Sequence, residues 1–136
     1  ARGPRGYALN KNSSHWTSRN MGILGTFIFI FLVIHLRSFW YEMHWGGIPT
    51  ANYAGIDYKN LYAVVDQAYT NLWFVILYVV SMALLAFHLF HGFGSAFQTL
   101  GLNHVKYNPL IKTVGVAFAI IVPALFALIP VYMYFN

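Results

Sequence analysis

The sequence contains no cysteine, only three acidic residues, and a charged fraction of 8%. Without cysteine, the chain supplies neither a disulfide bond nor a thiolate ligand for a metal ion or an iron–sulfur cluster. Any metal cofactor held by this chain therefore needs histidine. Soluble domains carry about 25% charged residues, so 59% hydrophobic and 19% aromatic residues indicate a membrane protein. In so apolar a chain, a net charge of +5 is more typical of membrane topology signals than of nucleic-acid binding.

Three apolar stretches, 21–40, 72–97 and 114–135, have the roughly 20 residues that a helix needs to cross a bilayer. Backbone groups in lipid must be hydrogen-bonded within their segment, and these runs are too long for barrel strands. The sequence therefore predicts an all-α transmembrane helical bundle, with a basic segment at 1–20 and loops at 41–71 and 98–113. Because the chain starts at Ala1 without an initiator methionine, we expect it to be part of a longer protein.

Charged residues are divided unequally between the two sides of the predicted membrane. The basic residues before the first span and between the second and third are Arg2, Arg5, Lys11, Arg19, Lys106 and Lys112. The loop at 41–71 instead contains all three acids, Glu42, Asp57 and Asp66. By the positive-inside rule, the N-terminal segment and the loop at 98–113 are cytoplasmic, and the loop at 41–71 faces the outside.

Three of the six histidines, His35, His88 and His91, lie inside the predicted spans. Ionisable residues are unfavourable in lipid, so they usually face the bundle interior and have a function. Neutral imidazole is a common axial ligand of haem iron, whereas the alternative role is an interhelical hydrogen bond worth about 1 kcal/mol. The remaining histidines lie in polar flanks, where a solvated imidazole is the expected interpretation: His15, His44 and His104.

Helical spacing places His88, His91, Ser95 and Gln98 on one polar stripe of the second span. At 1.5 Å per residue, His35 lies about 20 Å from the cytoplasmic start of the first span. His91 and His88 lie only about 9 and 13 Å from the cytoplasmic end of the second. Two ligands of one haem must have nearly the same depth, so these histidines suggest two haems at two depths. The third span has no histidine, so either the partner ligands come from absent helices or one histidine is not a ligand.

Four segments together resemble a known family: SRNMG at 18–22, FLVIHL at 31–36, FHLFHGF at 87–93 and SAFQTLGLNHVKYNP at 95–109. They are similar to the cytochrome b membrane-anchor subunit of bacterial succinate dehydrogenases and fumarate reductases. The form they resemble has five helices and two haems and occurs in Bacteroidetes-like bacteria. The resemblance covers essentially the whole chain and corresponds to the last three helices, so the first two are expected to be missing here.

In this family four histidines, one on each of the first four helices, ligate two b haems. The resemblance therefore implies that His35 ligates the distal haem near the outer face and His91 the proximal haem near the cytoplasmic side. His91 is preferred over His88 because the family's ligand on this helix is followed directly by glycine, as His91 is by Gly92. Leu89 stands where some menaquinol-oxidising relatives have a proton-transferring glutamate, so a proton route through that side chain is absent.

Further residues are candidates for contacts with the haems or the quinone. Arg19 and Lys106 have the charge to pair with haem propionates, although lone basic residues at a membrane boundary are more often topology signals. His88 and Ser95 are additional candidates for the haem pocket. A quinone carbonyl needs a hydrogen-bond donor in a mostly apolar cleft. The candidate donors are Ser14, Ser18, Ser95 and Gln98.

The resemblance implies a multi-pass subunit of the bacterial cytoplasmic membrane that docks a flavoprotein subunit and an iron–sulfur subunit on its cytoplasmic face. Such a subunit passes electrons between the iron–sulfur centres, haem b and a membrane quinone such as menaquinone, while the dicarboxylate chemistry belongs to the flavin. Two alternatives stay open. One is a bis-histidine cytochrome b of another quinone-linked dehydrogenase, and the other is a haem-free structural or transport subunit.

Overall fold

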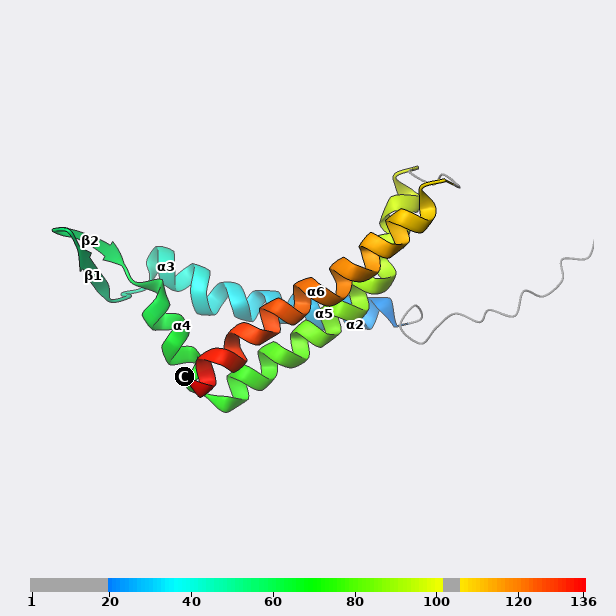
Figure 1. Ribbon diagram of the computed structural model, residues 1–136. Helices are drawn as coiled ribbons and strands as arrows, with labels where there is room; N and C mark the ends of the chain where they lie inside the picture. The colour runs from blue at the N-terminus through cyan, green and yellow to red at the C-terminus, as the bar shows by residue number, and fades with distance from the viewer. Residues whose placement is uncertain (1–19, 102–105) are drawn as a thin grey trace, which may run out of the picture.

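The computed structural model describes residues 20–101 and 106–136, and this part of the chain is mostly helical (Figure 1). Three helices in it are long and apolar enough to cross a membrane. The elements in chain order are α2 (Met21–His35), the π-helix η1 (Leu36–Tyr41), α3 (Glu42–Trp45), β1 (Thr50–Tyr53), β2 (Ile56–Lys59), α4 (Leu61–Tyr69), α5 (Leu72–Thr99) and α6 (Asn108–Phe135). The all-α, multi-pass membrane class predicted from the sequence is therefore confirmed.

The helices extend beyond the predicted spans, only slightly in α5, which ends at Thr99, and further in the other two. The first spanning segment continues through η1 and α3 to Trp45, and the third begins at Asn108 instead of residue 114. Pro109 lies in the first turn of α6, where a missing backbone N–H has no intrahelical acceptor to lose. The polar residues that lead into α6 therefore form its first turns, and the helical part of 98–113 is larger than the sequence suggested.

α5 and α6 run side by side along their length (Figure 1) and form the most extensive contact between any two elements of the described chain. The face of α6 that is buried consists of small residues and prolines: Gly115, Ala119, Pro123 and Pro130. Small side chains allow helix backbones to approach closely in lipid, where the hydrophobic effect does not hold helices together. α6 continues through both internal prolines, and the two proline rings are fully buried.

The distance between α2 and α5 changes along their length. Near the start of α2, a Cβ atom on Gly25 would lie only 3.6 Å from Cε1 of His88. At the end of α2, two long side chains, those of His35 and Tyr78, bridge the space between the helices. The two helices therefore diverge towards α4, as Figure 1 shows.

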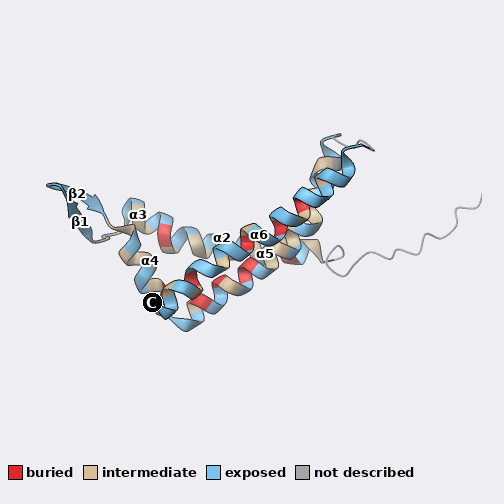
Figure 2. Ribbon diagram, viewed as in Figure 1, coloured by how far each residue is buried: buried red, intermediate tan, exposed pale blue. Residues whose placement is uncertain are grey.

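The outer surface of this bundle is apolar. Figure 2 shows few buried residues, which gather mainly where α5 meets α6. Large hydrophobic side chains on all three long helices are exposed, among them Phe29, Trp73 and Phe126. Soluble proteins rarely expose apolar patches of this extent, whereas lipid solvates them, so the surface is that of a membrane-embedded protein.

The segment between the first two spans, which the sequence suggested to be a loop, contains regular structure. β1 and β2 pair antiparallel, with Thr50 opposite Lys59 and Tyr53 opposite Ile56. Their tight turn has positive φ angles at Ala54 (52°) and Gly55 (83°), as expected for a two-residue hairpin loop that follows the strand twist. Nζ of Lys59 donates a hydrogen bond of 2.6 Å to the carbonyl oxygen of Met43, which ties the hairpin to α3.

Candidate functional site

A hydrogen bond between two spanning segments marks the candidate site. Nδ1 of His35, the last residue of α2, lies 3.3 Å from the hydroxyl oxygen of Tyr78 in α5. The Tyr78 side chain is only 4% exposed. Burying a phenol is unfavourable unless its hydroxyl has a partner, and His35 provides one. The pair therefore places an oriented imidazole inside the bundle.

Aromatic rings surround this pair. Phe31 and Phe39 lie one helical turn before and after His35, with ring centroids 5.9 and 5.5 Å from the imidazole. The ring of Tyr78 meets Phe31 edge to face at 5.0 Å. Phe39 and Tyr78 also belong to the buried core cluster, together with Tyr69 and Val75. The imidazole of His35 therefore lies in a largely apolar surrounding.

Tyr69, at the end of α4, closes the cluster from outside the spanning segments. Its ring centroid lies 5.3 Å from that of Tyr78. Burial raises the pKa of Tyr69 to about 12, because the charged phenolate is poorly solvated there. Its hydroxyl is therefore neutral at physiological pH, and it adds no charge beside His35.

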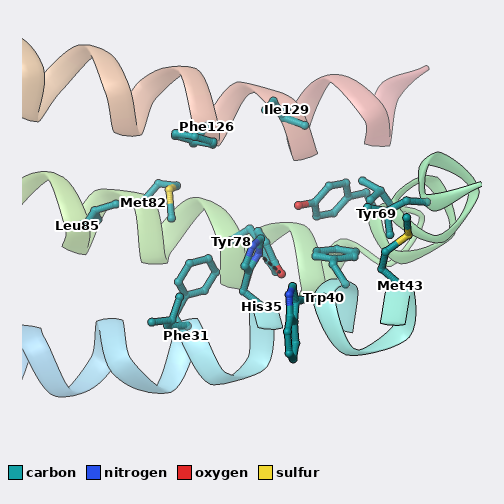
Figure 3. Close-up of a pocket in the computed structure, with 14 residues that line it drawn as sticks. Phe31, His35, Trp40, Met43, Tyr69, Tyr78, Met82, Leu85, Phe126 and Ile129 are labelled. Atoms are coloured by element: carbon teal, nitrogen blue, oxygen red, sulfur yellow. Dashed lines mark hydrogen bonds between the residues drawn. The ribbon is translucent and has the colours of Figure 1, made fainter. Parts of the chain in front are cut away.

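A cavity of about 580 Å³ opens beside this pair, where α2 and α5 diverge (Figure 3). Its size falls within the range of small-molecule and cofactor pockets, roughly 300 to 1,000 Å³. Nearly all of its lining is apolar or aromatic, and the polar groups come from a few side chains, including His35, Tyr69 and Tyr78. The other lining residues are Phe31, Leu32, Phe39, Trp40, Met43, Leu61, Val65, Met82, Leu85, Phe126 and Ile129.

The π-helix η1 begins directly after His35. A π-helical turn is wider than an α-helical one, and such segments occur frequently at functional sites. The last two residues of η1, Trp40 and Tyr41, both pack their rings against Trp45 in α3. The segment thus connects the site to the aromatic end of the span.

His88 and His91 lie at the opposite end of the α2–α5 contact. His88 faces α2 at Gly25, and its Nδ1 is buried without a hydrogen-bond partner among the described residues. His91 is half-buried, and its ring centroid lies 5.3 Å from that of Phe90. At the next residue, Gly92, an added Cβ atom would lie 3.8 Å from Cε of Met21 in α2. The structure therefore brings neither histidine to the level of His35.

The other predicted site residues that the structure describes do not lie together with His35. The hydroxyl of Ser95 is exposed and donates to the carbonyl oxygen of His91 at 3.3 Å. The ammonium group of Lys106 lies 5.7 Å from the ring of Tyr107. The predictions for Ser14, Ser18 and Arg19 lie outside the described residues, as does the side chain of Gln98.

A haem imidazole ligand usually has its second nitrogen held by a hydrogen bond, which fixes the ring orientation. His35 meets this requirement through Tyr78 and borders an apolar cavity. If a haem were bound, His35 could hold it at this level, and His91 or His88 could hold one at the other level.

Sequence reasoning did not identify Tyr78 or Tyr69. A usable signal was present, because a tyrosine within an apolar span needs a partner for its hydroxyl. Counted from the outer ends of the two predicted spans, His35 and Tyr78 have nearly equal depths. In antiparallel neighbours, equal depth makes contact possible.

Comparison with known proteins adds no further assignment. No family model matches the sequence, and no curated protein or solved structure is significantly similar to it. What the structure defines is a class: a multi-pass, all-α membrane protein with a histidine–tyrosine pair beside an apolar cavity.

Proposed function

We propose that this chain is the haem b-binding, quinone-interacting membrane part of a succinate dehydrogenase or fumarate reductase complex. The observation that carries the proposal is the arrangement of the intramembrane histidines. His35 lies level with Tyr78, and His91 lies close to the opposite end of the α2–α5 contact. From residue 78 to residue 91, α5 rises by about 20 Å. One haem cannot be ligated at two levels so far apart, so the arrangement favours two haems.

His91 is the better candidate for the cytoplasmic-side ligand. The side chain of His88 points at α2, where Gly25 makes room for it. On the helical wheel, His91 is rotated by about 60° from His88, away from the α2-facing side (three steps of about 100° each). α6 has no histidine, so a partner ligand for each haem would come from a further helix. A side chain at the border of the α2 contact is accessible to such a helix.

The roles of the chain's own residues follow from these positions. His35 and His91 hold and orient the two haems, which supply one-electron transfer when bound. The apolar lining of the cavity gives the His35 imidazole surroundings of low polarity. The exposed apolar faces of the three spans contact lipid and the remaining helices of the subunit. The flavoprotein and iron–sulfur subunits dock on the cytoplasmic side, at the N-terminal segment and the connection between α5 and α6, and quinone binds within the membrane.

One structural observation favours a second candidate function, that of a haem-free structural subunit. The bond between His35 and Tyr78 joins two helices, and interhelical hydrogen bonds of this kind stabilise membrane bundles by about 0.6 to 2 kcal/mol. In this alternative, the histidines hold helices together and bind no cofactor. The two functions differ in visible absorption.

The deciding experiment is a dithionite-reduced minus oxidised spectrum of the intact complex, with haem quantified per flavin. We expect two b haems per flavin in the wild type, and we expect His35→Ala and His91→Ala each to remove a different one. His88→Leu is the matched control on the same helix and should retain both haems. A wild-type complex without haem would establish the structural alternative.

If His35→Ala and His91→Ala remove the same haem, the two-level arrangement is wrong. Flavin content in the membrane fraction separates loss of haem from loss of assembly, because the flavin belongs to a partner subunit. A variant that retains flavin but lacks one haem has lost a ligand and not the complex.

A further inference from the structure

We infer that Tyr78 is the positioning residue for His35: its hydroxyl holds Nδ1 of the imidazole and leaves Nε2 as the nitrogen available to a metal. This inference rests on the proposed function, because it assigns Nε2 to haem iron. It adds a residue that lies on a different helix and does not touch the iron.

The geometry fixes the position of the hydroxyl. The ring of Tyr78 is packed among Phe31 at 5.0 Å, Phe74 at 4.8 Å and Tyr69 at 5.3 Å between centroids. With the side chain 4% exposed, the ring cannot turn without disturbing this packing. The hydroxyl oxygen is therefore a stationary partner, 3.3 Å from Nδ1 of His35.

Metal binding through Nε2 requires the neutral tautomer that carries its proton on Nδ1. A neutral imidazole has one N–H donor and one nitrogen lone pair. If Nδ1–H donates to the oxygen of Tyr78, the lone pair is on Nε2, and the ring presents a ligand nitrogen. A neutral acceptor at Nδ1 also makes the imidazole more basic. A more basic ligand stabilises ferric over ferrous iron, so this bond lowers the reduction potential of the haem bound to His35.

The other histidines provide a contrast. Nδ1 of His44, in α3, bonds the backbone carbonyl oxygen of Trp40, four residues earlier in the same continuous helical path, at 2.8 Å. Nδ1 of His88 has no partner among residues 20–101 and 106–136. The bond of His35 to Tyr78, in contrast, crosses between two spanning segments. It therefore couples the orientation of the imidazole to the packing of α2 against α5.

The test is Tyr78→Phe in the intact complex, with Tyr69→Phe as the matched control. Both substitutions remove one buried phenol hydroxyl and keep the ring, but in the described part of the chain only Tyr78 is hydrogen-bonded to His35. Haem content and the two midpoint potentials are measured by optical redox titration. We expect one potential to rise in Tyr78→Phe, or that haem to be held about tenfold less tightly, while the second haem is unchanged. The affected haem must be the one that His35→Ala removes.

Three results would overturn the inference or its premise. Unchanged potentials and full haem content in Tyr78→Phe would show that the hydroxyl does not act on the ligand. An equal shift in Tyr69→Phe would show a general packing effect. If the wild-type complex contains no haem, the proposed function itself is wrong. That result is distinct from the first two, which would exclude only the role of Tyr78 as a positioning residue.

Discussion

Gly25 of α2 and His88 of α5 face each other where the two helices approach, and a Cβ atom on Gly25 would lie 3.6 Å from Cε1 of His88. This distance is an ordinary van der Waals contact, so a methyl group fits but a longer side chain does not. Membrane helices associate largely through close packing of small residues. Gly25 therefore sets the spacing between α2 and α5 at the level of His88.

We expect Gly25→Ala to be tolerated and Gly25→Leu to weaken the packing of α2 against α5. The leucine must push His88 or the α2 backbone aside, and overpacking of this kind usually destabilises by about 1 to 3 kcal/mol. Thermal inactivation of the complex in mild detergent measures the effect. Gly22→Leu is the control, because no atom of residues 20–101 and 106–136 lies within 4 Å of a Cβ at Gly22. Equal thermal stability of the two leucine variants would show that α2 does not pack against α5 at Gly25.

The spanning helices could be predicted from sequence because the bilayer imposes a length. A helix crosses the hydrocarbon core only with about 20 apolar residues, and the predicted span at 72–97 coincides with the apolar part of α5. The ends of the other two were predicted less well. The first span was predicted to end at residue 40, but the helical path continues to Trp45 because polar residues there, such as Glu42, remain compatible with a helix.

The rotation of each helix about its axis could not be predicted in the same way. Side chains that face lipid and side chains that face the bundle are both apolar, so α2 shows no clear polar and apolar sides. Depth alone separated His35 from His91, but it could not show that His35 meets Tyr78 while His88 meets Gly25. Those contacts depend on how α2 and α5 cross.

The cavity was also beyond the sequence, since it arises from the divergence of α2 and α5 and from the way α4 returns towards the bundle. Asn60 caps α4, because its side-chain oxygen accepts a hydrogen bond of 3.2 Å from the backbone N–H of Ala63. This cap residue is recognisable in sequence. The direction in which α4 then runs, and hence the position of Tyr69 over the site, depends on tertiary packing.

The packing of α6 on α5 gives a second prediction. A Cβ atom on Gly115 would overlap Cδ1 of Phe93 and lie 3.0 Å from its Cγ. Gly115→Ala should therefore destabilise the pair by about 1 to 3 kcal/mol, even though alanine is the better helix former. Thermal inactivation of the complex is again the measurement.

A compensating change distinguishes this clash from other effects. Phe93→Leu removes ring atoms from the site of overlap, so the double variant should be more stable than the sum of the two single changes predicts. Strict additivity would mean that the ring of Phe93 does not limit the residue at 115. Ala119 lies one helical turn from Gly115 and is buried on the same face of α6. A substitution at Ala119 therefore serves as a reference for how far a change on this face alters the stability of the helix pair.

The orientation proposed for the chain gives the last prediction, and the lack of cysteine makes it simple to test. Ile56 in the hairpin and Leu110 at the start of α6 have similarly exposed side chains, 56% and 62%. We introduce Ile56→Cys and Leu110→Cys separately and treat intact cells with a membrane-impermeant maleimide. Because α5 separates the two positions by one membrane crossing, the cysteine at 56 should react in intact cells and the one at 110 only after permeabilisation. The reverse pattern would invert the topology derived from the basic residues, and reaction of both in intact cells would show that α5 does not cross the membrane.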